Sequence, residues 1–119
     1  MTPNELEDRL IDFAVLALKI VKILPDDASG KVLKYQLSKS GTSPALNYGE
    51  VRSAESKRDF IHKNKIVNKE LRETYINLKI IKRSNMVADK IIDIALNEAN
   101  ELVAIFTTTI NTSSKTIKG

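Results

Sequence analysis

The sequence contains no cysteine, no tryptophan and a single histidine, and it is poor in glycine, proline and aromatic residues. The absence of cysteine excludes disulfides, thiolate catalysis and cysteine-ligated metals, and it is compatible with a reducing compartment. Only 5% of the residues are aromatic although 42% are hydrophobic, so the apolar content is mainly leucine, isoleucine, valine and alanine. This balance favours packed helices over a sheet-rich fold.

Metal-binding and catalytic motifs are also missing from the sequence. His62 has no second histidine with which to share a metal, and the neighbouring Lys63 and Lys65 would repel a cation. Glu70 and Glu73 have helical i, i+3 spacing, but di-iron bundles need a Glu-x-x-His pattern on two helices. We therefore predict a protein that is not an enzyme and that holds no metal and no cofactor.

Long apolar runs are absent as well. No run approaches the roughly 20 residues that cross a bilayer, and the first residues are polar and acidic rather than basic. We expect no signal peptide, no membrane partner and a cytoplasmic location. At 119 residues the chain fits one domain, and such a domain can bury roughly two-thirds of the surface that its unfolded chain exposes.

Apolar periodicity predicts four helices in this domain. Thr2, Pro3 and Glu5 have the pattern of a capping box, and the segment Pro25-Asp26-Asp27 is expected to end the first helix and cap the second. Short connections between long helices predict an antiparallel up-down-up-down four-helix bundle. We expect the bundle to span residues 1–113, with a flexible tail at 114–119. The predicted helices cover residues 3–24, 28–54, 55–85 and 87–110.

Small and polar residues interrupt the second predicted helix. Gly41 and Pro44 disfavour a continuous helix, so a kink or break is expected near residues 41–44. A structural polar motif is predicted from this segment and the third helix, and it consists of Ser43, Asn47, Glu50, Glu70 and Glu73.

Two interpretations of the polar residues in the second helix remain. With Ser40 and Thr42, they could line a pocket. The alternative, which we favour, is that they satisfy backbone groups and pair with the third helix. In that case a buried Glu50 needs a cation such as Lys65 or Lys69.

Positive charge is concentrated in the third predicted helix. The formal net charge is only +4, yet residues 56–85 hold 9 basic and 3 acidic residues, a net of +6. At 100° per residue, Asp59, Glu70 and Glu73 fall on one flank, and six cations share an arc of roughly 80° on the other. These candidate nucleic-acid-binding residues, which we call the basic edge, are Arg58, Lys65, Lys69, Arg72, Lys79 and Arg83.

The basic edge has three possible uses. It can bind phosphates, it can be a solvated helix face, or it can pair with the acidic flank of a neighbouring copy in a cyclic oligomer. Tyr75 is the only aromatic residue nearby that could stack on a base. Any nucleic-acid binding should therefore depend on the phosphate backbone and weaken with salt.

The first and fourth predicted helices carry apolar residues on two faces. In the first, Ile11, Ala14, Leu18 and Val21 lie beside the main stripe. More apolar surface than one core can hold predicts self-association. In the fourth helix, the second stripe is Ile92, Leu96, Ala99, Val103 and Ile110.

The segment from Gln36 to Leu78 resembles the four-helix-bundle family named for proteins encoded in intervening sequences of 23S ribosomal RNA genes. The likeness extends to Leu24-Pro25 and to the run from Leu102 to Phe106. Pro44, Leu46 and Asn77 depart from the residues usual in the family. The residues that carry the likeness are Ser40-Gly41-Thr42-Ser43, Asn47-Tyr48-Gly49-Glu50, Ser56, Asp59-Phe60-Ile61-His62-Lys63, Lys69-Glu70 and Glu73-Thr74-Tyr75.

The resemblance implies a bundle that assembles into a ring, typically a homopentamer, without known catalysis. It also implies a relation to the accessory variability proteins of diversity-generating retroelements, which bind nucleic acid and a reverse transcriptase through a basic surface. We expect a non-enzymatic ring whose basic edge contacts RNA, DNA or a protein partner. The alternatives are a structural scaffold without a nucleic-acid role, and an enzyme, which would need a convergent polar pocket.

Overall fold

The structure is a computed structural model that describes the backbone of residues 1–118 and the side chains of residues 1–115. Within this part of the chain, no residue forms a strand. The prediction of an all-α four-helix bundle is confirmed. Its helices are α1 (Pro3–Ile23), α2 (Ala28–Arg52), α3 (Lys57–Arg83) and α4 (Ile91–Lys118).

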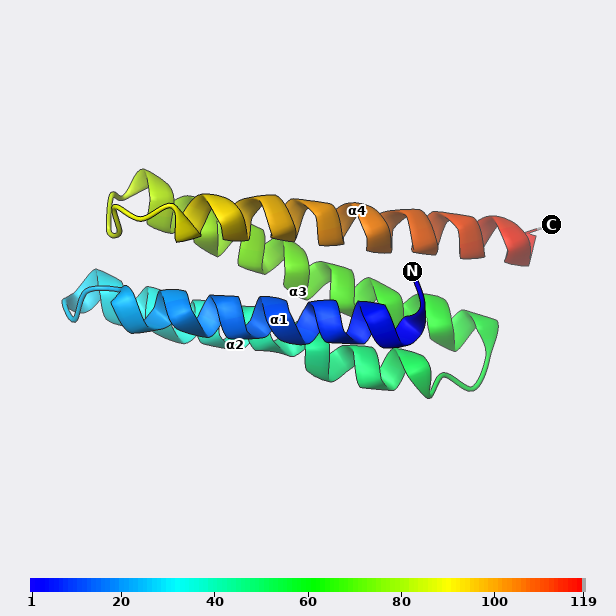
Figure 1. Cartoon of the computed structure of the whole chain (residues 1–119). Helices are drawn as coiled ribbons and strands as arrows, with labels where there is room; N and C mark the ends of the chain where they lie inside the picture. The colour runs from blue at the N-terminus through cyan, green and yellow to red at the C-terminus, as the bar shows by residue number, and fades with distance from the viewer. Residues whose placement is uncertain (119) are drawn as a thin grey trace.

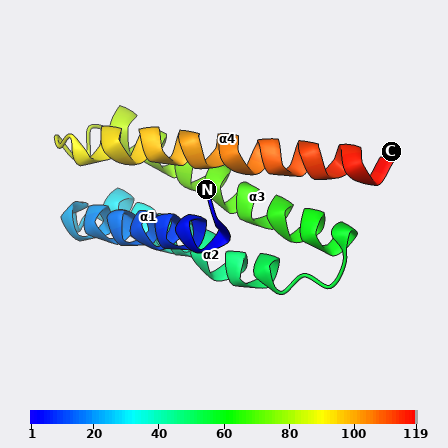
Figure 2. The same ribbon diagram turned by 45° about the vertical axis from the view of Figure 1, so that its right-hand side comes forward.

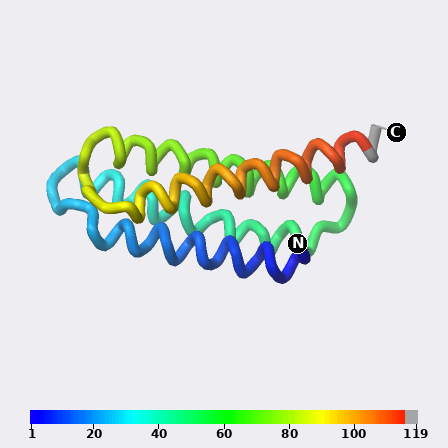
Figure 3. Tube along the Cα trace, turned by 45° about the horizontal axis from the view of Figure 1, so that its top comes forward, coloured from blue at the N-terminus to red at the C-terminus, as the bar shows by residue number. Residues whose placement is uncertain are grey.

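Each helix returns alongside the one before it (Figure 1). Between α3 and α4, Asn68 bonds to Thr107 and Lys82 pairs with Asp93, so residue numbers fall along one helix as they rise along the other. The same relation holds between α2 and α3. The turned views show the N-terminus of α1 and the C-terminus of α4 towards the same end (Figures 2 and 3). The bundle measures 51 × 23 × 21 Å.

Side-chain caps fix the starts of the first three helices. Thr2 and Glu5 form the predicted capping box, in which the Glu5 amide donates to Thr2 Oγ1 at 3.1 Å. Within the predicted capping segment at residues 25–27, Asp27 caps α2 by accepting from the Gly30 amide at 2.8 Å. Ser56 caps α3 by accepting from the Asp59 amide at 3.0 Å. Each cap satisfies an amide that the first helical turn leaves unbonded.

The range predicted for the fourth helix, 87–110, misses both of its ends. Asn85 adopts a left-handed conformation (φ 53°) after α3, and α4 begins only at Ile91, whose amide donates to Asp89 Oδ1. The helix then continues to Lys118, where we had expected loss of periodicity. Ser113 is buried in this extension, so packing continues beyond the predicted end. The flexibility of residues 114–119 stays a prediction. Gly119 and the side chains from residue 116 onward lie outside the described residues.

Helix α2 continues through Gly41 and Pro44 without a break. Pro44 has no amide proton and cannot bond to the carbonyl one turn earlier. Around this gap, the hydroxyls of Thr42 and Ser43 donate to the carbonyls of Ser38 and Lys39, at 2.7 and 2.6 Å. The carbonyl that Pro44 deprives of its amide donor is that of Ser40, so these bonds do not show the predicted satisfaction of freed backbone groups. Because the helix is continuous, the prediction of a break near residues 41–44 is wrong, whereas a bend of the helix axis there stays a prediction.

Gly41 allows α1 and α2 to approach closely. A Cβ atom at this position would lie 2.5 Å from the Cβ of Ala17. Around this contact lies one continuous core to which all four helices contribute. Its fully buried large side chains include Leu10, Phe13, Ile20, Leu37, Leu71, Leu78, Ile81, Leu102 and Phe106.

The second apolar stripes on α1 and α4 have different outcomes. On α1, Ile11 and Leu18 are 46% and 41% exposed, and the neighbouring Val15 is 46% exposed. On α4, Ile92 and Ala99 are buried, and the rest of the stripe is half-buried. The bundle itself therefore absorbs much of the double stripe on α4, while part of the second stripe on α1 stays exposed.

Candidate nucleic-acid interface

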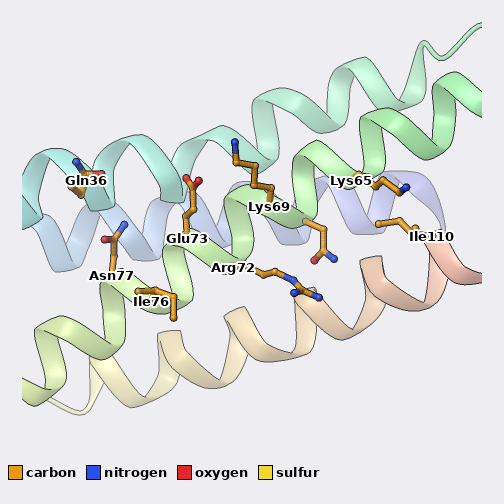
Figure 4. Close-up of a pocket in the computed structure, with 9 residues that line it drawn as sticks. Gln36, Lys65, Lys69, Arg72, Glu73, Ile76, Asn77 and Ile110 are labelled. Carbon is orange, nitrogen blue, oxygen red and sulfur yellow. The ribbon is translucent and has the colours of Figure 1, made fainter.

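An open groove of about 540 Å³ lies along the outer side of α3. Figure 4 shows its lining, in which Arg72 points towards α4 and Glu73 points towards α2. We call it the α3 groove. Most of its residues come from three successive turns of α3, because side chains three or four positions apart share a helix face. Its lining residues are Gln36, Lys65, Asn68, Lys69, Arg72, Glu73, Ile76, Asn77 and Ile110.

The basic edge is divided between the groove and the surface beside it. Lys65, Lys69 and Arg72 line the groove and are exposed. Arg58 and Arg83 are exposed outside it, near the two ends of α3. The sixth cation, that of Lys79, lies 4.8 Å from the centre of the Tyr75 ring, within the range of a cation–π contact.

None of the six cations of the basic edge forms an ion pair with any side chain of residues 1–115. Cations elsewhere in the bundle do form such pairs. Arg52 of α2, for example, lies 3.3 Å from Glu7 of α1. The other paired cations are those of Arg9, Lys34, Lys63 and Lys82. The basic edge therefore keeps its charges for water or for a partner.

Asn68 is a groove residue that the sequence analysis did not single out. It is 7% exposed, and its Nδ2 donates to Thr107 Oγ1 of α4 at 3.1 Å. Its Oδ1 has no hydrogen-bond partner. A buried polar atom without a partner costs about 1–3 kcal/mol. The sequence does hold a signal for this residue, because Asn68 is a polar side chain among the core-facing positions of α3, beside Val67 and Leu71.

The acidic flank lies on the α2 side of α3. Burial and the neighbouring carboxylate of Glu73 raise the pKa of Glu70, while Lys69 and Lys39 act in the opposite direction. Asp59, the third member of the flank, is 3.0 Å from Lys63 in an ion pair. The pKa of Asp59 is lowered, chiefly by its hydrogen bond with Lys63. Of the three carboxylates, Asp59 is thus paired, whereas Glu73 borders the α3 groove.

The predicted polar motif does not gather into one site. Ser43 bonds to its own helix, while Asn47 and Glu50 line a separate small cavity of about 80 Å³ together with Lys63. The side chain of Glu50 is 69% exposed, and its nearest cation is Lys63 Nζ at 3.9 Å. The expectation of a buried Glu50 paired with Lys65 or Lys69 is therefore wrong. The register of α3 against α2 places Lys63 within ion-pair distance of Glu50.

Two of the family departures, Asn77 and Leu46, have different surroundings in the bundle. Asn77 Nδ2 donates to Ser40 Oγ of α2 at 3.0 Å, which gives the buried serine a partner. Leu46 is 74% exposed, so the bundle core does not constrain its size.

The described residues show few features of a reaction centre. His62 is exposed and lies outside the α3 groove, whose lining contains no histidine, serine, threonine or tyrosine. Side chains of residues 1–115 include no group of three acidic, histidine or cysteine residues that could hold a metal. Among the described helices, none has the length and apolarity needed to cross a membrane.

Together, the fold and this site define a small all-α bundle with a positively charged outer face. The chain belongs to the 23S rRNA-intervening sequence protein family, whose model matches residues 4–108. No curated protein matches the chain. A crystal structure of a protein of unknown function, from the S23 ribosomal protein family of Bacteroides thetaiotaomicron VPI-5482, is similar with a TM-score of 0.83 and 29% identity. The match covers 93% of this chain and 99% of that chain.

Proposed function

We propose that this protein is a non-enzymatic, ring-forming four-helix bundle that binds nucleic-acid backbones through the basic edge of α3. The observation that carries this proposal is the set of six cations on one helix face without ion-pair partners among the described side chains. Unpaired lysine and arginine side chains that follow one helix are suited to a row of phosphates. Binding of this kind is independent of sequence and weakens as salt rises.

Exposed apolar residues on α1 support the assembly part of the proposal. Ile11, Val15 and Leu18 lie on the outside of the bundle, and Val15 and Leu18 border a shallow apolar hollow that also includes Val21. A second copy of the chain would remove this surface from water. The resemblance to the family implies a homopentamer, and a reverse transcriptase or another protein as a further partner.

Charge reversal of Lys65, Lys69 and Arg72 to glutamate separates binding from assembly. We expect the triple variant to lose affinity for RNA and duplex DNA while its mass in sedimentation equals that of the wild type. The matched control reverses Lys31, Lys90 and Lys115, which are exposed, lie outside α3 and form no ion pair among the described side chains. An equal loss of affinity in both triple variants would contradict a binding role specific to α3. If only the Lys65, Lys69 and Arg72 variant dissociates into monomers, these three cations act in assembly.

The alternative function is a structural scaffold that binds no nucleic acid. The carboxylates of Glu70 and Glu73 on the α2 side of α3 favour it, because they form no ion pair among the described side chains and a neighbouring copy could set its basic edge against them. A salt series discriminates between the two functions. The scaffold predicts no salt-dependent affinity for RNA or duplex DNA in the micromolar range, whereas the binding function predicts affinity that falls steeply with salt.

A further inference from the structure

The buried amide of Asn68 distinguishes the α3 groove from a plain row of surface charges. Its Oδ1 is the only buried side-chain nitrogen or oxygen atom without a hydrogen-bond partner in the described part of the chain. Exchange of the amide oxygen and nitrogen would let Oδ1 accept from the Thr107 hydroxyl, but it would leave Nδ2 unpaired instead. In both orientations this groove-lining residue has one polar atom that lacks a partner and is almost wholly covered, so a ligand in the groove bonds to it only once the Asn68 side chain turns outward.

Two cations of the basic edge flank this amide. Lys65 precedes Asn68 by three residues and Arg72 follows it by four, so each lies about one helical turn away on the same side of α3. All three line the α3 groove, and Arg72 is directed towards α4 (Figure 4). The bond from Asn68 to Thr107 places the amide in the seam between α3 and α4. A ligand at this point would meet positive charge on either side of an unpaired amide.

Apolar side chains complete the surroundings. Ile76 of α3 and Ile110 of α4 line the same groove. The volume, about 540 Å³, falls within the range of about 300–1,000 Å³ that is usual for small-ligand sites. The ligand that fits combines phosphate groups, a hydrogen-bonding edge with both donors and acceptors, and an apolar body. A nucleotide has all three.

We infer that the α3 groove holds one nucleotide of a single strand, with its base bonded to Asn68 and its neighbouring phosphates on Lys65 and Arg72. This inference rests on the proposed function and makes it more specific. In a duplex, the Watson–Crick edges of the bases are paired and the bases are stacked, and the remaining donors and acceptors lie recessed in the grooves between the backbones. In a single strand, a base can turn out and present its edge to a protein. The groove therefore favours single strands over duplexes of equal charge.

The experiment compares a short oligouridine with an abasic strand of the same length, which keeps the phosphates and lacks the bases. Affinities are measured by fluorescence anisotropy at fixed low salt for the wild type, Asn68→Leu and Asn64→Leu. Asn64 is a matched control, since it is buried on the same helix, bonds to the Phe60 carbonyl and does not line the groove.

For the wild type, we expect oligouridine to bind about tenfold more tightly than the abasic strand, the order of one hydrogen bond to a buried group. Asn68→Leu should bind both strands equally, at the wild-type affinity for the abasic strand. Asn64→Leu should keep the preference for oligouridine. If Asn68→Leu does not fold by circular dichroism, Asn68→Ala replaces it.

Two results would overturn the inference and leave the proposed function intact. One is equal, salt-dependent binding of both strands by the wild type. The other is a preference for oligouridine that persists in folded Asn68→Leu. Absence of salt-dependent binding to either strand and to duplex DNA would instead overturn the proposed function itself.

Discussion

Arg9 and Arg72 show two different uses of the same side chain. Arg9 of α1 donates from Nε and Nη2 to the two carboxylate oxygens of Glu98, at 2.8 and 2.7 Å, and from Nη2 to Glu101 at 2.7 Å. The hydrogen bond with Glu98 is the main cause of the raised pKa of Arg9. Arg72 of α3 has no ion pair with any side chain up to residue 115. Charge at one edge of the bundle joins two helices, whereas charge on the α3 face is left for the surroundings.

The difference follows from how the helices pack. Helices α1 and α4 pack less extensively against each other than the other neighbouring pairs do, and the fork from Arg9 bridges them. Such bidentate pairs are stronger than single contacts and more specific in geometry. The six cations of the basic edge have no ion-pair partner among the described side chains, whereas Lys63 and Lys82, elsewhere on α3, pair with Asp59 and Asp93. A charged group without an internal partner contributes little to folding and remains available for binding.

The largest expected effect is on assembly. If the cations of α3 are free for a ligand, the copies of the chain in the proposed ring must be held together by another surface, and we expect this to be the apolar face of α1. Leu18→Glu places a charge on that face, and we expect the oligomer to dissociate into folded monomers. Val32→Glu is the control, since Val32 is 58% exposed on α2. Light scattering checks the masses, and an oligomer unchanged by Leu18→Glu would contradict the role of α1.

The next effect is on stability, and it tests the two arginines directly. Arg9→Met keeps much of the apolar stem and removes the fork, which leaves the half-buried Glu98 without its cation. We expect a loss of about 1–3 kcal/mol in the free energy of unfolding, the range for a broken charged hydrogen bond. Arg72→Met should change it by less than about 0.5 kcal/mol, as is usual for surface substitutions. Urea unfolding measures both, and equal losses would remove the distinction.

In nucleic-acid binding, Arg72→Met should have the larger effect and Arg9→Met the smaller one. Arg72→Met is expected to weaken RNA binding several-fold and to reduce the slope of log affinity against log salt by about 1, because one phosphate contact is lost. Arg9→Met should leave both quantities unchanged as long as the bundle is folded. A salt titration of each variant measures the slopes. A reduced slope for Arg9→Met would show that the α1–α4 edge also meets the nucleic acid.

The smallest effect is the pH dependence that Glu70 contributes. Burial, with the charge of Glu73, raises the pKa of Glu70 above its ordinary value of 4.5. The folded state therefore binds this proton more tightly than the unfolded state, and the contribution of Glu70 to stability falls as pH rises from 4.5 through the raised pKa. Glu70→Gln should remove this fall and slightly stabilise the protein above that interval. Urea unfolding at a series of pH values from 4.5 upward measures this, and Glu55→Gln is the control because Glu55 is exposed. If stability still falls with pH in Glu70→Gln, another group causes the fall.

Local signals made much of the fold predictable. The caps at Thr2 and Asp27 and the main apolar stripes needed only short-range rules, and those rules held. The start of α4 was missed because it depends on the left-handed turn at Asn85, which asparagine tolerates but does not require. Continuity of α2 through Pro44 was also missed, since packing of its neighbours outweighs the lost hydrogen bond.

The candidate site was predictable only in part. Helical projection placed the six cations on one face of α3, and the structure has them on α3 without ion-pair partners among the described side chains. Projection of single helices could not show which residues of neighbouring helices meet. The choice of Lys63 as the cation nearest Glu50, and the contact of Asn68 with Thr107, depend on the relative register of two helices. Whether these residues bind nucleic acid stays a prediction.

The close approach of Gly41 to Ala17 makes these two positions share a fixed volume. A methyl group at 41 would lie within 2.5 Å of the one at 17, so a gain at one position has to be matched by a loss at the other. Gly41→Ala and Ala17→Gly should each destabilise the bundle when made alone, and the double variant should recover stability beyond the sum of the two. The size of the side chain at one of these two positions therefore limits the size that the other can have.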